Sequence, residues 1–356
     1  MARLVFVLMF DMSFGPAASA CTTFCYADGG TLVFGRNYDW MVGDGLVMVN
    51  KRGVTKRALT ADAAAAQWTS KYGSLTFNQY GREFPTGGMN EKGLVVELMW
   101  LDDTRYPDPD TRGALPTLQW IQYQLDNAAT VGEVIASDRA VRISSAGSAK
   151  IHFLVADAAG GVAAIEFLDG RLVAHRGGEL PYPVLTNDTY DRSVRFARSA
   201  GARSGKSSTE SLDRFARAAS YRPDATSPAL AVRNAFATLD DVAQGDHTKW
   251  SIVYDIGAKR VYFRTHAARK VRWIDVASLG FACHRGASML DINAALGGDV
   301  TAGLQPYDPG ANRALVNTAF AKTPFLAGAT AEERDELARY PETTVCAGAE
   351  RKRGGK

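Results

Sequence analysis

The chain has 356 residues, of which 46% are hydrophobic and 22% are charged, a composition typical of a globular protein. Its formal net charge is only +3, from 41 basic and 38 acidic residues of mixed position, so the sequence offers no basic face for DNA or RNA. Residues 346–356 have the composition of a basic, flexible tail. The five histidines and four cysteines show no metal-ligand spacing, and we expect neither a metal nor a cofactor.

The first twenty residues have the pattern of a secretory signal peptide. One arginine precedes an apolar stretch, and Ala18-Ser19-Ala20 is an A-x-A site for signal peptidase. Cleavage there would leave 336 residues (356 minus 20) and would make Cys21 the first residue of the chain. No other apolar segment approaches the length needed to span a bilayer. We therefore expect a periplasmic or secreted protein without a membrane span.

The residues after this site predict a β-hairpin. "TTFCYA" and "TLVFGRN" are apolar and β-branched, and Asp28-Gly29-Gly30 between them has the chemistry of a tight turn. Further strands are predicted at 93–101, at 150–176, where Ala-Gly-Gly and Asp-Gly separate them, and at 251–265. Short turns of this kind join antiparallel neighbours, so the sheets should be largely antiparallel.

Two segments have helical periodicity. Apolar residues recur at spacings of three and four in 115–137, and 209–219 has a similar pattern. Strands come first, then helices, then strands again, which favours an α+β domain over a doubly wound parallel sheet. We find no internal repeat that would suggest a repeat protein.

A cysteine at a new N-terminus would combine a thiol and a free α-amine in one residue. An α-amine has a pKa of about 7.7 to 8.0, so near neutral pH part of it can accept the thiol proton. Nucleophile and base would then come from Cys21 alone, an arrangement suited to acyl transfer.

Two other interpretations of Cys21 remain open. A free cysteine is usually a small buried hydrophobic residue. A cysteine directly after a signal peptide can also be lipidated, although lipidation sites normally have a leucine-like residue where this chain has Ala18. The non-enzymatic alternative is therefore an exported lipoprotein or binding protein.

The motif "FGRNYDW", residues 34–40, ends the second predicted strand. Arg36 and Asp39 would lie near Cys21, which is carried by the partner strand of the same hairpin. An arginine beside a thiol lowers the thiol pKa, and a carboxylate beside an α-amine would orient the amine. The alternative is an exposed ion pair that stabilises the fold by about 0 to 1 kcal/mol.

Five spaced motifs together resemble the choloylglycine hydrolase family, which contains penicillin V acylases and bile salt hydrolases. They are "CTTF", "GRNYDW", "MNEKGLVVELMW" (89–100), "PVLTNDTYD" (183–191) and "DRFARAA" (213–219). They cover nearly all of the chain after the signal peptide. The resemblance implies an N-terminal nucleophile hydrolase domain over 21–345, folded as a four-layer αββα sandwich, that hydrolyses linear amides.

The resemblance also implies roles for five residues of this chain. Cys21 would be nucleophile and base, with Arg36 as the cation near its sulfur. Asp39 would hold the α-amine, and the side-chain amide of Asn187 would bind the oxyanion together with a main-chain amide near Trp100. Arg214 would complete this polar cluster.

Two tryptophans bear on the substrate. At the position that corresponds by resemblance to Trp100, bile salt hydrolases have an asparagine and Gram-positive penicillin V acylases have a tyrosine. A tryptophan there is similar to the Gram-negative acylase branch. Trp40 and Trp100 would form an aromatic wall for substrate, although buried tryptophans are also common in protein cores. The expected substrate is a small molecule with an apolar acyl group on a small polar amine. Penicillin V and N-acyl homoserine lactones are favoured, and conjugated bile salts are the alternative.

Two expectations concern assembly and cross-linking. The resemblance implies a homo-oligomer, a tetramer in bile salt hydrolases, but the segment between Asn187 and Arg214 is much shorter here than the loop that helps to assemble that tetramer. The oligomer is therefore expected to be organised differently. In an oxidising compartment Cys283 and Cys346 could form a disulfide, although the sequence alone does not fix the pairing.

Overall fold

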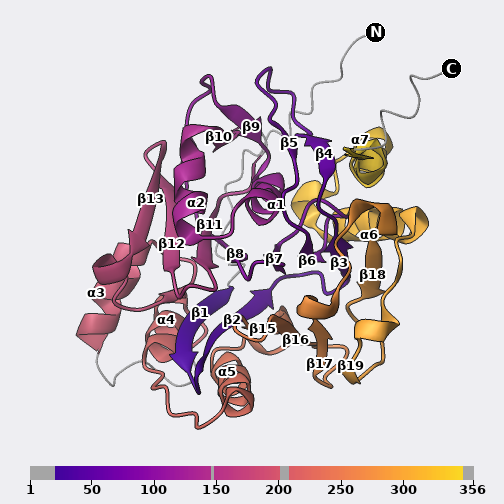
Figure 1. Cartoon of the computed structure of the whole chain (residues 1–356). Coiled ribbons are helices and arrows are strands. Elements are labelled where there is room, and N and C mark those ends of the chain that lie inside the picture. Colours follow the sequence, from indigo (N-terminus) through magenta and orange to yellow (C-terminus); the bar gives the residue numbers. More distant parts are fainter. Residues whose placement is uncertain (1–20, 146–147, 201–207, 348–356) are drawn as a thin grey trace, which may run out of the picture.

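The structure, a computed structural model, describes residues 21–145, 148–200 and 208–347 (Figure 1). The expected signal peptide at 1–20 lies outside the described residues, as do residues 348–356 of the expected tail. Two large β-sheets lie face to face, and helices cover the outer face of each sheet (Figure 1). These four layers agree with the predicted αββα sandwich.

The first sheet has seven strands and contains the start of the described chain. Their order is β14-β1-β2-β15-β16-β17-β19, and every neighbouring pair except β17 and β19 is antiparallel. The strands are β1 (Thr22–Asp28), β2 (Thr31–Asp39), β14 (Val184–Leu185), β15 (Thr248–Asp255), β16 (Arg260–Thr265), β17 (Arg272–Asp275) and β19 (Gly298–Asp299).

The second sheet has nine strands in the order β13-β12-β11-β8-β7-β6-β3-β18-β20, all antiparallel to their neighbours. The strands are β3 (Leu46–Asn50), β6 (Ser74–Asn78), β7 (Gly87–Asn90), β8 (Val95–Trp100), β11 (Ile151–Ala156), β12 (Val162–Leu168), β13 (Arg171–Arg176), β18 (Ser288–Asp291) and β20 (Gln305–Pro306). Two small sheets flank it, formed by β9 (Gly113–Leu115) with β10 (Val141–Ile143), and by β4 (Val54–Arg57), β5 (Gln67–Thr69) and β21 (Val345–Cys346).

The helices fall into three groups. One group, α1 (Thr117–Asn127) and α2 (Val131–Ala136), lies over the nine-stranded sheet, and α1 contacts β7 and β8. A second group covers the seven-stranded sheet, where α5 (Pro228–Asp241) contacts β1, β2 and β15. The third group, α6 (Pro309–Lys322) and α7 (Ala331–Arg339), packs as a pair beside the sandwich (Figure 1). The second group also contains α3 (Tyr190–Ala200) and α4 (Ser211–Ala219).

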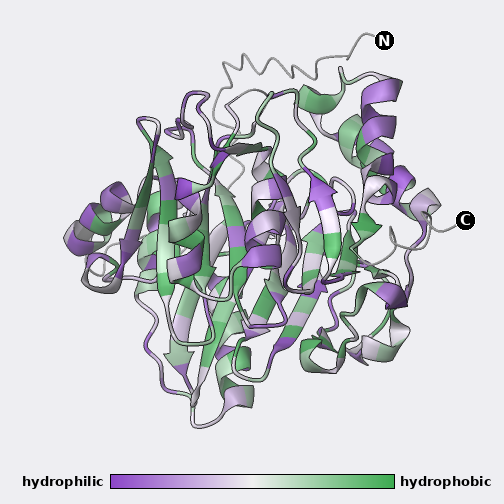
Figure 2. Cartoon of the chain, turned by 45° about the horizontal axis from the view of Figure 1, so that its top comes forward, coloured by the Kyte–Doolittle hydropathy of each residue, from purple (hydrophilic) through white to green (hydrophobic). Residues whose placement is uncertain are grey.

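Strand β8 shows how the sequence divides the core. Val95 and Met99 belong to the cluster that includes the seven-stranded sheet, whereas Val96 and Leu98 belong to the cluster under α1. This alternation is the period of two that a strand imposes on its side chains. Figure 2 shows hydrophobic residues concentrated along the strands, while the helices at the edge of the sandwich carry many hydrophilic residues. Glu97 lies between Val95 and Met99 in this alternation, so its side chain faces the space between the two sheets.

The predicted hairpins are confirmed. Strands β1 and β2 pair from Thr22 with Asn37 to Asp28 with Thr31, which leaves Gly29 and Gly30 as a two-residue turn. Both glycines have positive φ angles, 56° and 79°, a conformation that glycine adopts without the strain of a side chain. The strands predicted in 93–101, 150–176 and 251–265 are present as β8, β11 to β13, β15 and β16.

The predicted helix 115–137 is broken into α1 and α2. The break has a local cause, because Thr130 caps the start of α2. Its side chain accepts a hydrogen bond from the main-chain nitrogen of Glu133, and the Glu133 side chain accepts one from the main-chain nitrogen of Thr130. The helix predicted at 209–219 corresponds to α4.

Cys283 and Cys346 form a disulfide, the pairing proposed from the sequence. Cys346 also pairs with Val54 in the small sheet of β4, β5 and β21. The tail expected from residue 346 is thus corrected at its start, since that residue is held by a strand and a covalent bond. Among the helices of the described ranges, none is long and apolar enough to cross a membrane.

Candidate active site

Strand β1 places Cys21 at the end of the space between the two sheets. Thr23, two residues later and therefore on the same face, donates its hydroxyl hydrogen bond to Met99 of β8 in the facing sheet (3.3 Å). The register of β1 and β2, extended by one residue beyond Thr22 and Asn37, sets Cys21 opposite Tyr38. Cys21 is only 2% exposed, so its thiol is not a surface group.

Arg36 of β2 also points between the sheets. One of its terminal nitrogens donates to Glu97 of β8 and to the main-chain oxygen of Thr86 (3.0 Å). Both Arg36 and Glu97 are fully buried, so the two charges are compensated within the core. The Nε and Nη2 atoms of Arg36 have no hydrogen-bond partner among the described residues. Arg36 therefore keeps donors unused beside the cysteine.

The charge of Arg36 acts on the Cys21 thiol but does not dominate it. Arg36 lowers the pKa of the thiol, as expected from the sequence, yet burial is the larger effect and the pKa is raised overall. The lowering by Arg36 expected from the sequence is thus present, but burial outweighs it. A thiol in this state does not ionise readily by itself, and it needs a base to remove its proton.

Asp39, at the end of β2, contacts Cys21 through its main chain. The Cys21 sulfur lies 3.9 Å from the Asp39 main-chain oxygen. In the Asp39 carboxyl group, Oδ1 accepts a hydrogen bond from the Thr248 hydroxyl, whereas Oδ2 is buried and has no partner among the described residues. Burial raises the pKa of Asp39 to about 6, against the opposing influence of Arg214. The site therefore holds a carboxylate oxygen that is short of a donor.

Arg214 of α4 ties three segments of the site together. It donates to the main-chain oxygen of Cys21 (2.7 Å), to the Thr22 hydroxyl (2.6 Å) and to Oδ1 of Asn187 (2.8 Å). Arg214 is fully buried. Because a guanidinium group is planar and has donors in fixed directions, these bonds set the relative positions of α4, the start of β1 and the segment after β14.

The bond from Arg214 also orients the amide of Asn187. With Oδ1 accepting from Arg214, Nδ2 faces the other way and donates to the main-chain oxygen of Trp100 (2.9 Å). An amide nitrogen carries two hydrogens, so Asn187 has one further donor.

The main chain of Trp100 points to the same side as this amide. Leu101 donates to Lys150 (3.0 Å) at the end of the pairing of β8 with β11. In an antiparallel pair the bonded residues alternate, so the N–H and C=O of Trp100, one residue earlier, point away from β11. Strand β7, on that side, pairs with β8 only from Val95 to Glu97. The Trp100 N–H is therefore directed to the side on which its C=O meets Asn187.

A cavity of about 210 Å³ opens beside Cys21; we call it the cysteine cavity. Trp40 and Trp100 both line it, and their ring centroids are 6.5 Å apart. The aromatic wall expected from the sequence is thus present next to the sulfur. The remaining wall is mostly apolar and includes Leu98, Ile151, Phe320, Phe325, Leu326 and Leu337.

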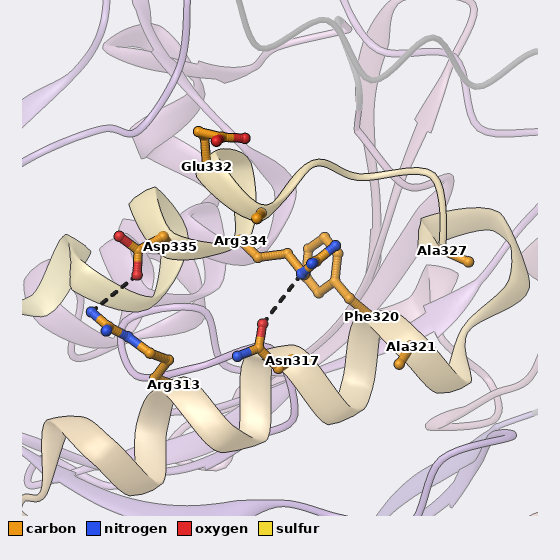
Figure 3. Close-up of a pocket in the computed structure, with 9 residues that line it drawn as sticks. Arg313, Asn317, Phe320, Ala321, Ala327, Glu332, Arg334 and Asp335 are labelled. Atoms are coloured by element: carbon orange, nitrogen blue, oxygen red, sulfur yellow. Dashed lines mark hydrogen bonds and ion pairs between the residues drawn. The ribbon is translucent and has the colours of Figure 1, made fainter.

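A second cavity of about 650 Å³ lies between α6 and α7, and we call it the outer groove (Figure 3). Its lining contains no sulfur and no cluster of catalytic type. Four of its polar side chains interact with one another. Arg313 forms an ion pair with Asp335 (3.0 Å), and Arg334 donates a hydrogen bond to Asn317 (3.2 Å). The chemistry of the described chain is therefore concentrated at the cysteine cavity.

The structure brings together all the site residues predicted from the sequence, and it adds others. Glu97 and Thr248, which bind Arg36 and Asp39, were not predicted. A signal for Glu97 was present, since it is the only charge in the apolar run "GLVVELMW". Nothing in the sequence pattern indicated that Phe320 and Phe325, near the end of the chain, line the same cavity as Cys21.

Comparison with known proteins gives a consistent result. Residues 21–200 match the linear amide C-N hydrolases, choloylglycine hydrolase family. The chain is 28% identical to a penicillin V acylase of Pectobacterium atrosepticum, over 79% of this chain and 88% of the relative. It resembles the structure of penicillin V acylase from Agrobacterium tumefaciens with a TM-score of 0.71 and 28% identity, over 81% of this chain and 98% of that one. A conjugated bile acid hydrolase from Clostridium perfringens shares the fold, with a TM-score of 0.63 and 18% identity over 76% of this chain and 96% of the other.

Proposed function

The chain belongs to the choloylglycine hydrolase family of linear amide C-N hydrolases, and we propose that it removes an apolar acyl group from a small polar amine, with Cys21 as an N-terminal nucleophile. The observation that carries this proposal is the position of the Cys21 sulfur. It lies at an apolar cavity, where the charges of Arg36 and Asp39 both act on it. Each of these two side chains keeps polar atoms without a partner among the described residues.

The proposal includes removal of residues 1–20 by signal peptidase and export to the periplasm or beyond. Ala18-Ser19-Ala20 precedes Cys21, and the family match begins at Cys21. The disulfide between Cys283 and Cys346 fits an oxidising compartment. Cleavage would create an α-ammonium group, the kind of donor that Oδ2 of Asp39 lacks. A homo-oligomer organised differently from the bile salt hydrolase tetramer stays a prediction.

In the first step the α-amine of Cys21 takes the proton of the thiol. The raised pKa of the thiol makes this base necessary. The sulfur then attacks the amide carbon, a C–S bond forms, and the carbonyl oxygen becomes an oxyanion. Arg36, with two unused nitrogens nearby, stabilises negative charge on the sulfur, while Glu97 holds the guanidinium in place.

Two donors are positioned for the oxyanion. One is the second Nδ2 hydrogen of Asn187, and the other is the main-chain N–H of Trp100, which points to the same side of β8. Preorganised donors of this kind stabilise a tetrahedral intermediate more than the ground state. Arg214 contributes indirectly, because it fixes the Asn187 amide in the orientation that this role needs.

The intermediate then collapses. The carbonyl re-forms, the C–N bond breaks, and the α-ammonium of Cys21 gives its proton to the leaving nitrogen. Water completes the cycle: the α-amine takes a proton from it, the resulting hydroxide adds to the thioester carbon, and the C–S bond breaks. The sulfur recovers its proton from the α-ammonium, so Cys21 ends as it began.

The cavity indicates the acyl side of the substrate. Its walls are mostly aromatic and aliphatic side chains, among them Trp40 and Trp100, which suit a flat aryl or an extended alkyl group. Relatives named penicillin V acylase support phenoxyacetyl amides. N-Acyl homoserine lactones are amides of the same kind, with an apolar acyl group on a small polar amine. Conjugated bile salts are the alternative, since a bile acid hydrolase shares the fold.

The test is hydrolysis of penicillin V, an N-acyl homoserine lactone and taurocholate by one preparation of the processed protein. We expect turnover of at least one of the first two and a preference for them over taurocholate. A preference for taurocholate would contradict the role assigned to Trp100. Absence of hydrolysis in a folded protein that starts at Cys21 would favour the exported binding protein instead.

Matched cysteine variants make this test specific. Cys21→Ala should abolish hydrolysis, and Cys25→Ala should retain it, because Cys25 is the other free buried cysteine on the same face of β1 but does not line the cavity. Equal activity of the two variants would reject Cys21 as the nucleophile.

A further inference from the structure

Phe320 of α6 contributes to both cavities of the molecule. It lines the cysteine cavity, and it also lines the outer groove between α6 and α7 (Figure 3). Phe320 is itself only 4% exposed. A single buried side chain thus borders the largely apolar cysteine cavity on one side and the more polar outer groove on the other.

On the cavity side, Phe320 belongs to a small apolar cluster between the sheets and the α6–α7 pair. Its ring meets that of Tyr80 edge to face, with centroids 6.3 Å apart, and Tyr80 also lines the cysteine cavity. Leu326 and Leu337 belong to the same cluster and line the same cavity. Phe320 is therefore part of the wall of the cysteine cavity formed by the C-terminal part of the chain.

On the groove side, Arg334 of α7 lines the outer groove together with Phe320, and Asn317 lies on the same helix as Phe320 (Figure 3). Small residues complete this part of the groove, among them Ala321 and Ala327. The surface beyond the ring is thus made of methyl groups and of the stem of Arg334, which an alkyl chain can contact without burying an unpaired charge.

The α6–α7 pair is fixed to the rest of the molecule. The side chain of Asn312 accepts from the main-chain nitrogen of Arg82 (2.8 Å) and donates to the main-chain oxygen of Ala338 (2.9 Å), so it links α6 to both α7 and the sandwich. The disulfide between Cys283 and Cys346 bridges the segments on either side of the pair. A wall held in this way has a fixed position relative to Cys21.

We propose that Phe320 is the partition between the two cavities and that it limits the length of the acyl group the enzyme accepts. This inference rests on the proposed function and specifies its substrate class. A short acyl group fits between the tryptophans and Phe320. A longer straight chain meets the ring, and removal of the ring joins the cysteine cavity to the outer groove, through which the end of the chain can pass.

The experiment compares Phe320→Ala with Phe325→Ala in the processed enzyme. Phe325 is a matched control, because it lines the cysteine cavity and packs on Trp40 (centroids 6.0 Å apart) but does not line the outer groove. The substrates are N-acyl homoserine lactones with straight acyl chains of increasing length, from butanoyl to tetradecanoyl. The quantity compared is kcat/KM for each length relative to hexanoyl.

We expect Phe320→Ala to raise the ratio of dodecanoyl to hexanoyl kcat/KM by at least about 10-fold, since each methylene in an apolar site changes this quantity by a factor of about 10 or more. Phe325→Ala enlarges the cavity without opening it to the groove, and should shift the preference by only one or two methylenes. An unchanged length profile in Phe320→Ala, or an equal shift in both variants, would overturn the proposal.

Two controls separate the possible failures. If the unaltered enzyme hydrolyses none of the series, inhibition of penicillin V hydrolysis by fatty acids of the same lengths provides the length profile instead; hydrolysis of neither class defeats the proposed function itself. The midpoint of thermal unfolding identifies a misfolded variant, because truncation of a buried phenylalanine leaves a cavity that destabilises the fold. Phe320→Leu, a smaller change, should then show an intermediate shift in length preference, and no shift would count against the partition.

Discussion

The side-chain amide of Asn187 donates a 2.9 Å hydrogen bond to the main-chain oxygen of Trp100. These residues are 87 positions apart in the sequence. Trp100 ends β8 of the nine-stranded sheet, and Asn187 follows β14 of the seven-stranded sheet. The bond leaves one Nδ2 hydrogen of Asn187 unused, on the side to which the Trp100 N–H also points. This arrangement gives the oxyanion assignment its geometric basis.

Asn187→Ala should lower kcat by about 10²- to 10³-fold with a smaller change in KM, because a donor to the oxyanion acts mainly in the transition state. Steady-state kinetics on penicillin V would measure this. Asn127→Ala is a suitable control, since the Asn127 amide also donates to a main-chain oxygen (2.9 Å) but lies on α1. Near-normal kcat in Asn187→Ala would remove the assignment.

Arg214→Lys should lower kcat at least about 10-fold while retaining the positive charge. Lysine lacks the planar donor pattern that allows Arg214 to bind Cys21, Thr22 and Asn187 at once. The expected defect is in kcat rather than KM, because the misplaced groups are Asn187 and the start of β1 rather than the acyl wall. A variant that folds, as judged by circular dichroism, and keeps full kcat would show that the charge alone suffices.

The burial of Asp39 leads us to predict that a chain starting at Ala20 and one starting at Cys21 differ in their free energy of unfolding, and that this difference depends on pH. With an amide at the Cys21 nitrogen, burial raises the pKa of Asp39 from 3.8 to about 6. A raised carboxyl pKa means that ionised Asp39 destabilises the fold: the cost is absent below about pH 4 and complete above about pH 6. Its upper size is about 3 kcal/mol, the free energy that corresponds to a rise of the pKa from 3.8 to about 6.

An α-ammonium at Cys21 would offset this cost. The chain starting at Cys21 should therefore be the more stable of the two between about pH 6 and pH 8, and the difference should vanish as the pH falls below about 4 and Asp39 becomes protonated in both. It should also shrink above about pH 8, where the α-amine loses its proton. Thermal unfolding across this range tests the prediction. A difference that is constant with pH would mean that Asp39 does not face the α-amine.

Loss of the disulfide should destabilise the C-terminal part of the molecule. Cys283 and Cys346 are separated by 63 positions, for which chain entropy gives about 4 kcal/mol, and measured effects are commonly about 2 to 4 kcal/mol. Denaturant unfolding of Cys283→Ser/Cys346→Ser, compared with the intact protein, gives this quantity. The control is addition of reductant, which should reproduce the effect in the intact protein and leave the double variant unchanged. Equal stability of all samples would show that the cross-link contributes nothing.

The sequence predicted those features that depend on neighbours in the chain. The hairpin of β1 and β2 follows from alternation and from Gly29-Gly30, and its register brings Arg36 and Asp39 to Cys21 without any distant contact. The roles of Asn187 and Arg214 came from the resemblance to a known family rather than from their own pattern. The structure supplies the hydrogen bonds that connect them to the start of β1.

Other features depend on long-range packing that no local pattern encodes. The net effect of burial on the Cys21 thiol outweighs that of Arg36, and burial of this degree requires both sheets and the helices around them. Phe320 reaches the cysteine cavity only because the α6–α7 pair packs beside the sandwich, almost 300 positions along the chain from Cys21. The order of the sheet strands and the placement of such a pair are set by the whole fold.

The central claim is that Cys21 becomes an N-terminal nucleophile. The most direct measurement is the intact mass of active enzyme recovered from an exporting host, with and without an acid-quenched reaction. We predict the mass of a chain that begins with an unmodified Cys21, and in the quenched sample that mass plus one acyl group, which is absent in Cys21→Ala. Full activity in a protein that retains residues before Cys21, or that carries a lipid on it, would contradict the account.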